Sequence, residues 1–125
     1  MKEIKFLDPS IKRKKNITNI SFQIMKGTNY PLPSEVEISE SGTCNRKCSF
    51  CPRSDPEYKD VKEFIAPALH SKLIQEFKKY DFKGVLRYSG FVEPLLDKNI
   101  YDLINHARHN LQARIEMVTN GDVLD

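Results

Sequence analysis

Residues 35–53 read EVEISESGTCNRKCSFCPR, and this stretch decides the fold. It opens with Val36 and Ile38 alternating with polar residues, which is the period of a half-buried strand. A loop rich in Pro, Ser and Asp follows, from about residue 41 to residue 66, and it carries all three cysteines of the chain. A strand that leads into such a loop is typical of parallel sheets, which place their sites at the carboxyl ends of strands.

Beyond the loop, the pattern alternates between helix and strand. Pro67 suits the first turn of a helix that runs to about Tyr80. Residues 85–88 predict a second strand, Asp97 is expected to cap a second helix, and residues 115–118 predict a third strand. The helices are defined by apolar residues at Leu69, Leu73, Phe77 and Tyr80 and at Ile100, Leu103, Ile104 and Ala107. This order implies right-handed crossovers, a parallel sheet and an α/β fold.

The first 34 residues differ from the rest in charge. Residues 1–34 hold seven Lys and Arg against two Asp and Glu, whereas residues 35–125 hold thirteen against fifteen. Residues 12–15 read KRKK, which is either a patch for a polyanion or acidic partner or a solvated surface segment. The alternation of Ile20, Phe22 and Ile24 permits a short edge strand. We interpret 1–34 as a basic N-terminal extension.

Composition excludes several classes of protein. The chain has 125 residues, 39% hydrophobic and 30% charged, which is ordinary for one globular domain. No apolar run is long enough to cross a bilayer, and the first residues lack the apolar stretch of a secretion signal. The net charge of +3 is too small to indicate nucleic acid as a partner. An odd number of cysteines in a chain without an export signal favours a reducing, cytoplasmic location.

Cys44, Cys48 and Cys51 are spaced C-x3-C-x2-C, and clustered thiols in the cytosol indicate metal or redox chemistry. Three thiolates on one tight loop can hold three corners of a cubane iron–sulfur cluster and leave one iron open. Arg46, Lys47 and Arg53 would add positive charge beside such an anionic cluster. Structural zinc is the alternative, and it would need a fourth ligand. The candidates for that ligand are His70, His106 and His109, although all three fit as ordinary helix residues.

The cysteine motif, with Phe50 just before the third cysteine, resembles the signature of radical S-adenosylmethionine (radical SAM) enzymes. Members of that superfamily fold as a partial (β/α)6 barrel, related to the TIM barrel, with the cysteine loop after the first strand. The resemblance therefore implies that residues 35–125 form the N-terminal half of such a core, with about three parallel strands and two helices. The later strands of the family core would lie outside these residues.

Two later segments strengthen the resemblance. Residues 88–96 read YSGFVEPLL, similar to the family segment that binds the amino group of the methionine moiety. Gly90 and Glu93 match its contacts, while Val92 stands where the family usually has glycine. Thr119 and Asn120, in a Thr-Asn-Gly segment, resemble residues that line the cofactor pocket. All three segments come at the carboxyl ends of successive predicted strands.

The resemblance implies an enzyme with two cofactors, a [4Fe–4S] cluster and S-adenosylmethionine. Cys44, Cys48 and Cys51 would ligate the cluster. The residues expected to bind S-adenosylmethionine are Phe50, Gly90, Glu93, Thr119 and Asn120. A low-potential donor of the flavodoxin or ferredoxin type would supply an electron. Reductive cleavage would then give a 5′-deoxyadenosyl radical that abstracts hydrogen from a substrate, either a peptide or a small metabolite. Two alternatives are a non-catalytic iron–sulfur or zinc module and a basic adaptor that binds RNA or protein.

Overall fold

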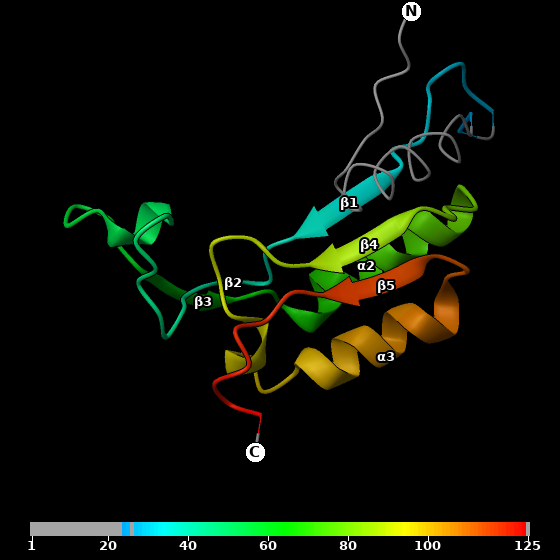
Figure 1. The fold of residues 1–125 in the computed structure, drawn as a ribbon. Coiled ribbons are helices and arrows are strands. Elements are labelled where there is room, and N and C mark those ends of the chain that lie inside the picture. The colour runs from blue at the N-terminus through cyan, green and yellow to red at the C-terminus, as the bar shows by residue number, and fades with distance from the viewer. Residues whose placement is uncertain (1–23, 26, 125) are drawn as a thin grey trace, which may run out of the picture.

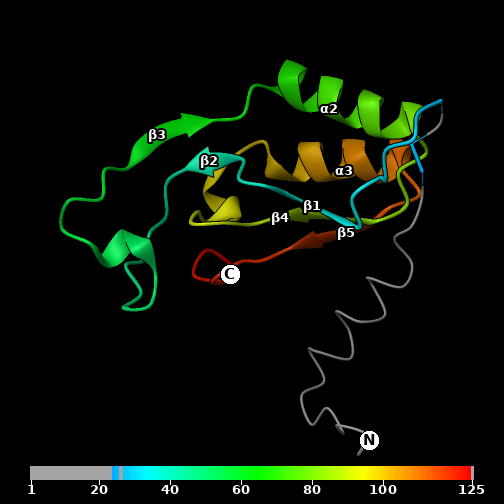
Figure 2. The same cartoon turned by 90° about the horizontal axis from the view of Figure 1, so that it is seen from above.

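The computed structural model describes residues 24–25 and 27–124. Its centre is a sheet of three parallel strands in the order β1–β4–β5. These strands are β1 (Glu35–Ile38), β4 (Val85–Tyr88) and β5 (Arg114–Met117), and the helices that connect them are α2 (Pro67–Lys79) and α3 (Ile100–Asn110). Both helices lie on the same face of the sheet (Figures 1 and 2). The predicted α/β class and parallel pairing are confirmed, including the pairing of the third strand with the second.

The core lies between the sheet and the two helices. Leu86 and Tyr88 are fully buried, and alternate residues of β1 and β5 extend the same apolar layer. The helices contribute Ile74 and Ile100, which are 0% and 1% exposed. Phe82, just after α2, is 2% exposed and packs against Phe77 with 5.2 Å between ring centroids. This layer fixes where each strand ends and therefore where the loops begin.

Two details of the predicted helices are corrected. The buried face of α2 is centred on His70 and Ile74, one position on from the predicted Leu69 and Leu73, and Leu69 is 51% exposed. The reason is a polar pair in the core, because His70 Nε2 lies 2.7 Å from the Tyr88 hydroxyl. Asp97 is not the N-cap of α3. It closes the short 3-10 helix η2 (Pro94–Leu96), and the N-cap position belongs to Asn99.

The cysteine loop contains regular structure that the sequence did not predict. β2 (Ser41–Gly42) pairs antiparallel with β3 (Val61–Phe64), and a 3-10 turn, η1 (Pro52–Ser54), lies between them. All four residues of β3 are exposed, so no hydrophobic alternation marks this strand. The small hairpin projects from one end of the main sheet (Figure 1). It closes the cysteine loop at its base.

The sheet face opposite the helices is polar and carries a ladder of charges. Arg87, on the central strand, forms ion pairs with Glu35 on β1 and with Glu116 on β5. Arg114 adds an ion pair to Glu116 at 2.8 Å. Glu37 follows on the same face, and its carboxylate accepts a hydrogen bond from the Ser89 hydroxyl at 2.7 Å. Successive side chains of a strand point to opposite faces of the sheet. The charged residues therefore alternate along each strand with the apolar residues that face the helices.

The N-terminal segment is described only in part. Residues 12–15, and Ile20 and Phe22 of the permitted edge strand, lie outside the described residues. Ile24 forms an isolated antiparallel bridge with Pro31. No helix in the described part of the chain has both the length and the apolar character that a bilayer crossing requires.

Candidate functional site

The three cysteines lie on the loop between β2 and β3, and all three thiols are free and partly exposed. A turn connects two of them, because the Cys51 N–H donates to the Cys48 carbonyl at 2.9 Å. The Ser54 hydroxyl, at the end of η1, donates to the Cys51 carbonyl at 2.8 Å. Since these bonds use backbone carbonyls, the sulfur atoms remain available to a ligand.

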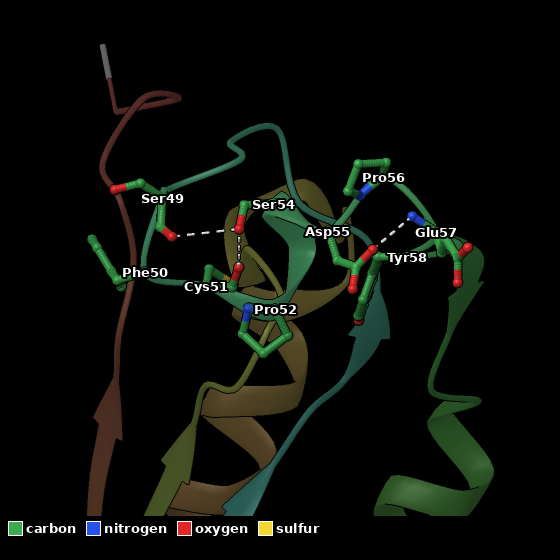
Figure 3. Close-up of a pocket in the computed structure, with 9 residues that line it drawn as sticks. All are labelled: Ser49, Phe50, Cys51, Pro52, Ser54, Asp55, Pro56, Glu57 and Tyr58. Carbon is green, nitrogen blue, oxygen red and sulfur yellow. Dashed lines mark hydrogen bonds between the residues drawn. The ribbon is translucent and has the colours of Figure 1, made fainter.

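An open hollow of about 770 Å³ lies along the second half of this loop. Cys51 lines it, with Phe50 and Tyr58 on opposite sides (Figure 3). Phe50 is 90% exposed, so the aromatic residue of the cysteine motif packs against little of the described protein. The exposed ring is free to contact a bound molecule at the edge of the loop.

Asn120, three residues beyond the end of β5, reaches the first cysteine. Its side-chain amide donates to the Asn45 side chain at 2.8 Å and lies 3.9 Å from the Cys44 sulfur. The Arg46 N–H donates to the same sulfur at 3.4 Å. Donors around a sulfur stabilise its thiolate form, which is the form that ligates iron.

Glu93 joins the remaining predicted residues. Its side chain is 1% exposed, and its carboxylate accepts three hydrogen bonds. The donors are the Thr119 hydroxyl at 2.6 Å, the Asn120 N–H at 2.7 Å and the Leu95 N–H at 3.0 Å. The Glu93 N–H in turn donates to the Thr43 carbonyl at 3.0 Å. Glu93 therefore ties the ends of β4 and β5 to the start of the cysteine loop.

Gly90 adopts a backbone conformation that favours glycine. Its φ is +127°, and a Cβ at this position would clash with the Ser39 hydroxyl and lie 3.8 Å from a Glu37 carboxylate oxygen. Ser39 also donates to the Ser89 carbonyl at 3.0 Å, which fixes the close approach of β1 and β4 at their carboxyl ends. Gly90 therefore sets the path of the segment that leads to Glu93.

We expect Gly90→Ala to destabilise this segment more than a positive φ alone explains. Gly27→Ala is the matched control, because Gly27 has a φ of +81° and an added Cβ there would meet nothing within 4 Å. The control should lose about 1 kcal/mol of unfolding free energy from strain, and Gly90→Ala should lose clearly more, both because its φ lies further from the left-handed region and because of the added clash. Urea unfolding of both variants measures the difference, and equal losses would contradict this account.

Two cations of the loop have carboxylate partners. Arg46 pairs with Asp122, and Arg53 pairs with Asp60. Arg53 is only 2% exposed and also donates to the Phe91 carbonyl at 3.0 Å. Arg53 is expected to provide charge beside a cluster, and these contacts show that it also braces the loop against the residues that follow β4. The sequence gives no sign of this bracing role, because an arginine beside a cysteine motif is first interpreted as a source of positive charge for a cluster.

A buried polar cluster lies beneath the site. Glu40, just after β1, is 1% exposed, and one of its carboxylate oxygens has no hydrogen-bond partner among the described residues. Burial, joined by the negative charges of Asp97 and Glu93, raises the pKa of Glu40 from 4.5 to about 7. The Tyr88 hydroxyl lies nearby, and burial together with the charge of Glu40 raises its pKa.

We expect Glu40→Gln to change how stability depends on pH. Because its pKa is raised in the folded state, Glu40 binds a proton more tightly when folded, so stability falls as pH rises from 4.5 to about 7. That fall corresponds to about 3 kcal/mol. Glu40→Gln should abolish most of it and make the variant the more stable form at pH 8. Unfolding free energies at pH 5 and pH 8 test this, with Glu76→Gln on exposed α2 as control, and an unchanged pH slope in Glu40→Gln would contradict it.

The predicted histidine ligands do not join the cysteines. His70 faces Tyr88 and lies near His106, at 5.8 Å between ring centroids. Burial, with the neighbouring charge of His106, lowers the pKa of His70. His109 bonds to the Asn105 carbonyl of its own helix. Within the described residues, no three His, Cys, Asp or Glu side chains are placed to hold a metal ion, and this holds equally for the zinc site and for the cluster.

The three thiols nevertheless fit a cluster by their chemistry. All are unpaired, all lie on one solvent-facing loop, and one of them already receives N–H donors. Their sulfur atoms are not gathered around a common point in this structure. The structure thus brings together Cys44, Glu93, Thr119 and Asn120 among the predicted site residues.

No protein-family model matches the chain. A curated relative, the S-adenosyl-L-methionine-dependent 2-deoxy-scyllo-inosamine dehydrogenase of Niallia circulans, is 34% identical over 94 residues. The match covers 74% of this chain and 37% of the relative. The chain therefore spans less than two fifths of the length of that enzyme.

Two solved structures are similar over the same share of the chain. The crystal structure of BtrN in complex with AdoMet and 2-DOIA has a TM-score of 0.69 and 33% identity, over 74% of this chain and 38% of that one. BtrN in an open conformation has a TM-score of 0.66 and 33% identity, over 75% and 42%. These comparisons relate the chain to an enzyme, as expected, and to one whose structure holds the expected cofactor, S-adenosylmethionine.

The comparisons correct the assignment drawn from the motifs. The sequence was interpreted as resembling the radical SAM superfamily at large, but no family model matches. The similarity found is to a particular S-adenosylmethionine-dependent dehydrogenase, over part of its length. The similarity to that dehydrogenase narrows the assignment, and it supports the superfamily only over the part of the chain that matches.

Proposed function

We propose that the chain forms the cofactor-binding part of an S-adenosylmethionine-dependent dehydrogenase that acts on an amine-bearing cyclic polyol. The observation that carries the proposal is the meeting of Cys44, Glu93, Thr119 and Asn120 at the carboxyl ends of the parallel strands. The substrate class follows that of the curated relative. Residues 35–125 would form part of a (β/α) barrel, with 1–34 as a basic extension.

Each group of residues has a distinct task in this proposal. Cys44, Cys48 and Cys51 would hold a [4Fe–4S] cluster through their thiolates. Glu93 and Gly90 would hold the methionine end of S-adenosylmethionine, with Glu93 also orienting Thr119 and Asn120. Phe50 would contact the cofactor from the rim of the loop. When bound, the two cofactors supply a radical that takes a hydrogen atom from the substrate, and the protein binds, orients and excludes water.

The proposal also names a partner and a compartment. A low-potential donor of the flavodoxin or ferredoxin type would reduce the cluster. Three free thiols on an exposed loop support a reducing, cytoplasmic environment, because such thiols oxidise readily elsewhere.

Anaerobic reconstitution tests the proposal. We expect about four iron and four sulfide per chain, and S-adenosylmethionine should perturb the EPR signal of the reduced protein. Because the match spans less than two fifths of the curated relative, formation of 5′-deoxyadenosine with a reductant and 2-deoxy-scyllo-inosamine is expected of the whole protein and not of residues 1–125 alone. Stoichiometric zinc without sulfide would overturn the cluster assignment. A whole protein whose cluster responds to S-adenosylmethionine but yields no 5′-deoxyadenosine would instead indicate a non-catalytic module.

A further inference from the structure

Asp122 connects two loops that are far apart in the sequence. Its carboxylate accepts hydrogen bonds from Arg46 Nε at 2.7 Å and from Asn45 Nδ2 at 3.2 Å, and it forms an ion pair with Arg46 Nη2. Asn45 and Arg46 directly follow the first cysteine, whereas Asp122 lies beyond β5. A planar guanidinium held at two nitrogens by one carboxylate has a fixed orientation as well as a neutralised charge.

Asn120 makes a second connection between the same loops. Its side-chain oxygen accepts the Asp122 N–H at 2.9 Å, and its side-chain nitrogen donates to Asn45 Oδ1 at 2.8 Å. The same nitrogen lies 3.9 Å from the Cys44 sulfur. Both donors to that sulfur, the Asn120 amide and the Arg46 N–H, therefore belong to residues that Asp122 contacts.

We propose that Asp122 is a positioning residue for Cys44. By holding Asn45 and Arg46, it keeps the donors directed at the sulfur and offsets the positive charge of Arg46 beside it. The inference deepens the proposed function, and it rests on that function only for the identity of the metal group. Asp122 itself touches no reacting atom in this arrangement.

The first test uses the full chain without metal, so that it stands whether or not a cluster forms. Asp122→Asn keeps the side-chain shape but removes the charge, which loosens the loop and leaves Arg46 unneutralised. We expect iodoacetamide to alkylate Cys44 about threefold to tenfold faster, because the partly exposed sulfur is no longer held between its donors and becomes more accessible to the reagent. Mass spectrometry follows each cysteine separately, and Cys51 serves as the internal reference whose rate should not change.

Two further variants separate positioning from a general charge effect. Asp122→Glu keeps the carboxylate and should restore most of the slow rate at Cys44. Asp102→Asn, on the exposed side of α3, removes the same charge far from the loop and should leave the rate unchanged. The Asp122–Arg46 pair is exposed, so its loss should cost little stability and the variants should fold.

The reconstituted protein provides the second test. Loss of the Asp122 charge should raise the reduction potential of the cluster by the equivalent of about a tenfold change in equilibrium constant, which is about 59 mV for one electron. An unchanged Cys44 rate in Asp122→Asn, or equal acceleration at Cys51, would overturn the positioning role. A changed Cys44 rate in a chain that binds no iron would overturn the proposed function and leave the positioning role intact.

Discussion

Replacement of Cys48 by alanine is expected to abolish cluster binding. Iron should fall from about four per chain to near zero, because a cubane held by three thiolates loses a corner that no neighbouring side chain can supply. In the part of the chain that the structure describes, no other cysteine exists and the histidines face the core or their own helix. Iron and sulfide analysis after anaerobic reconstitution measures the effect.

Ser49→Ala is the matched control for Cys48→Ala. Ser49 is the next residue on the same loop, its side chain is exposed, and its hydrogen bond from Ser54 uses the backbone carbonyl. The variant should keep the full iron content. If the two variants retained the same amount of iron, the cysteine loop would not be the cluster site.

Glu93→Ala is expected to separate cofactor binding from cluster binding. The change removes the acceptor of three hydrogen bonds and leaves buried donors unpaired, which should cost about 2–4 kcal/mol of unfolding free energy. It should weaken S-adenosylmethionine at least about tenfold, which is about 1.4 kcal/mol, while the cysteines still hold iron. Calorimetric titration and iron analysis of the same sample give the two readouts.

Two control variants separate the expected loss of unfolding free energy in Glu93→Ala from its effect on cofactor binding. Glu63→Ala, on the exposed strand β3, removes a carboxylate without a buried donor and should leave both readouts unchanged. Thr119→Val removes one of the three donors and should give a smaller loss of affinity than Glu93→Ala. Equal iron loss in Glu93→Ala and Cys48→Ala would contradict the division of roles between the two loops.

The main sheet and its helices could be predicted because their periodicity is strong. Residues 85–88 form β4 as predicted, and α2 begins at Pro67 as predicted. The buried face of α2 was predicted one position too early. The hydrophobic pattern centred it on Leu69, whereas the buried residue is the polar His70, which that pattern does not count. The hairpin of β2 and β3 was missed because backbone pairing forms it while the side chains of β3 stay exposed, so no hydrophobic pattern indicates it.

The contacts of the candidate site could also be predicted only in part. The convergence of Cys44, Glu93 and Asn120 follows from topology, because the carboxyl ends of parallel neighbours meet at one edge of the sheet. The contact between Arg46 and Asp122 does not follow, since it depends on side-chain directions in two loops separated by 76 residues. The only sequence signal for Asp122 is its place directly after the Thr-Asn-Gly segment.

The charge ladder on the open face of the sheet also favours the observed order of the strands. The guanidinium of Arg87 on β4 lies between the carboxylates of Glu35 on β1 and Glu116 on β5. These ion pairs favour β4 as the central strand, with β1 and β5 on either side of it. If β1 paired directly with β5, Glu35 or Glu37 would face Glu116 across the pair, and like charges directly opposite are destabilising. A slip of one residue would turn Arg87 into the apolar layer. The ladder therefore favours the observed strand order and register over these alternatives.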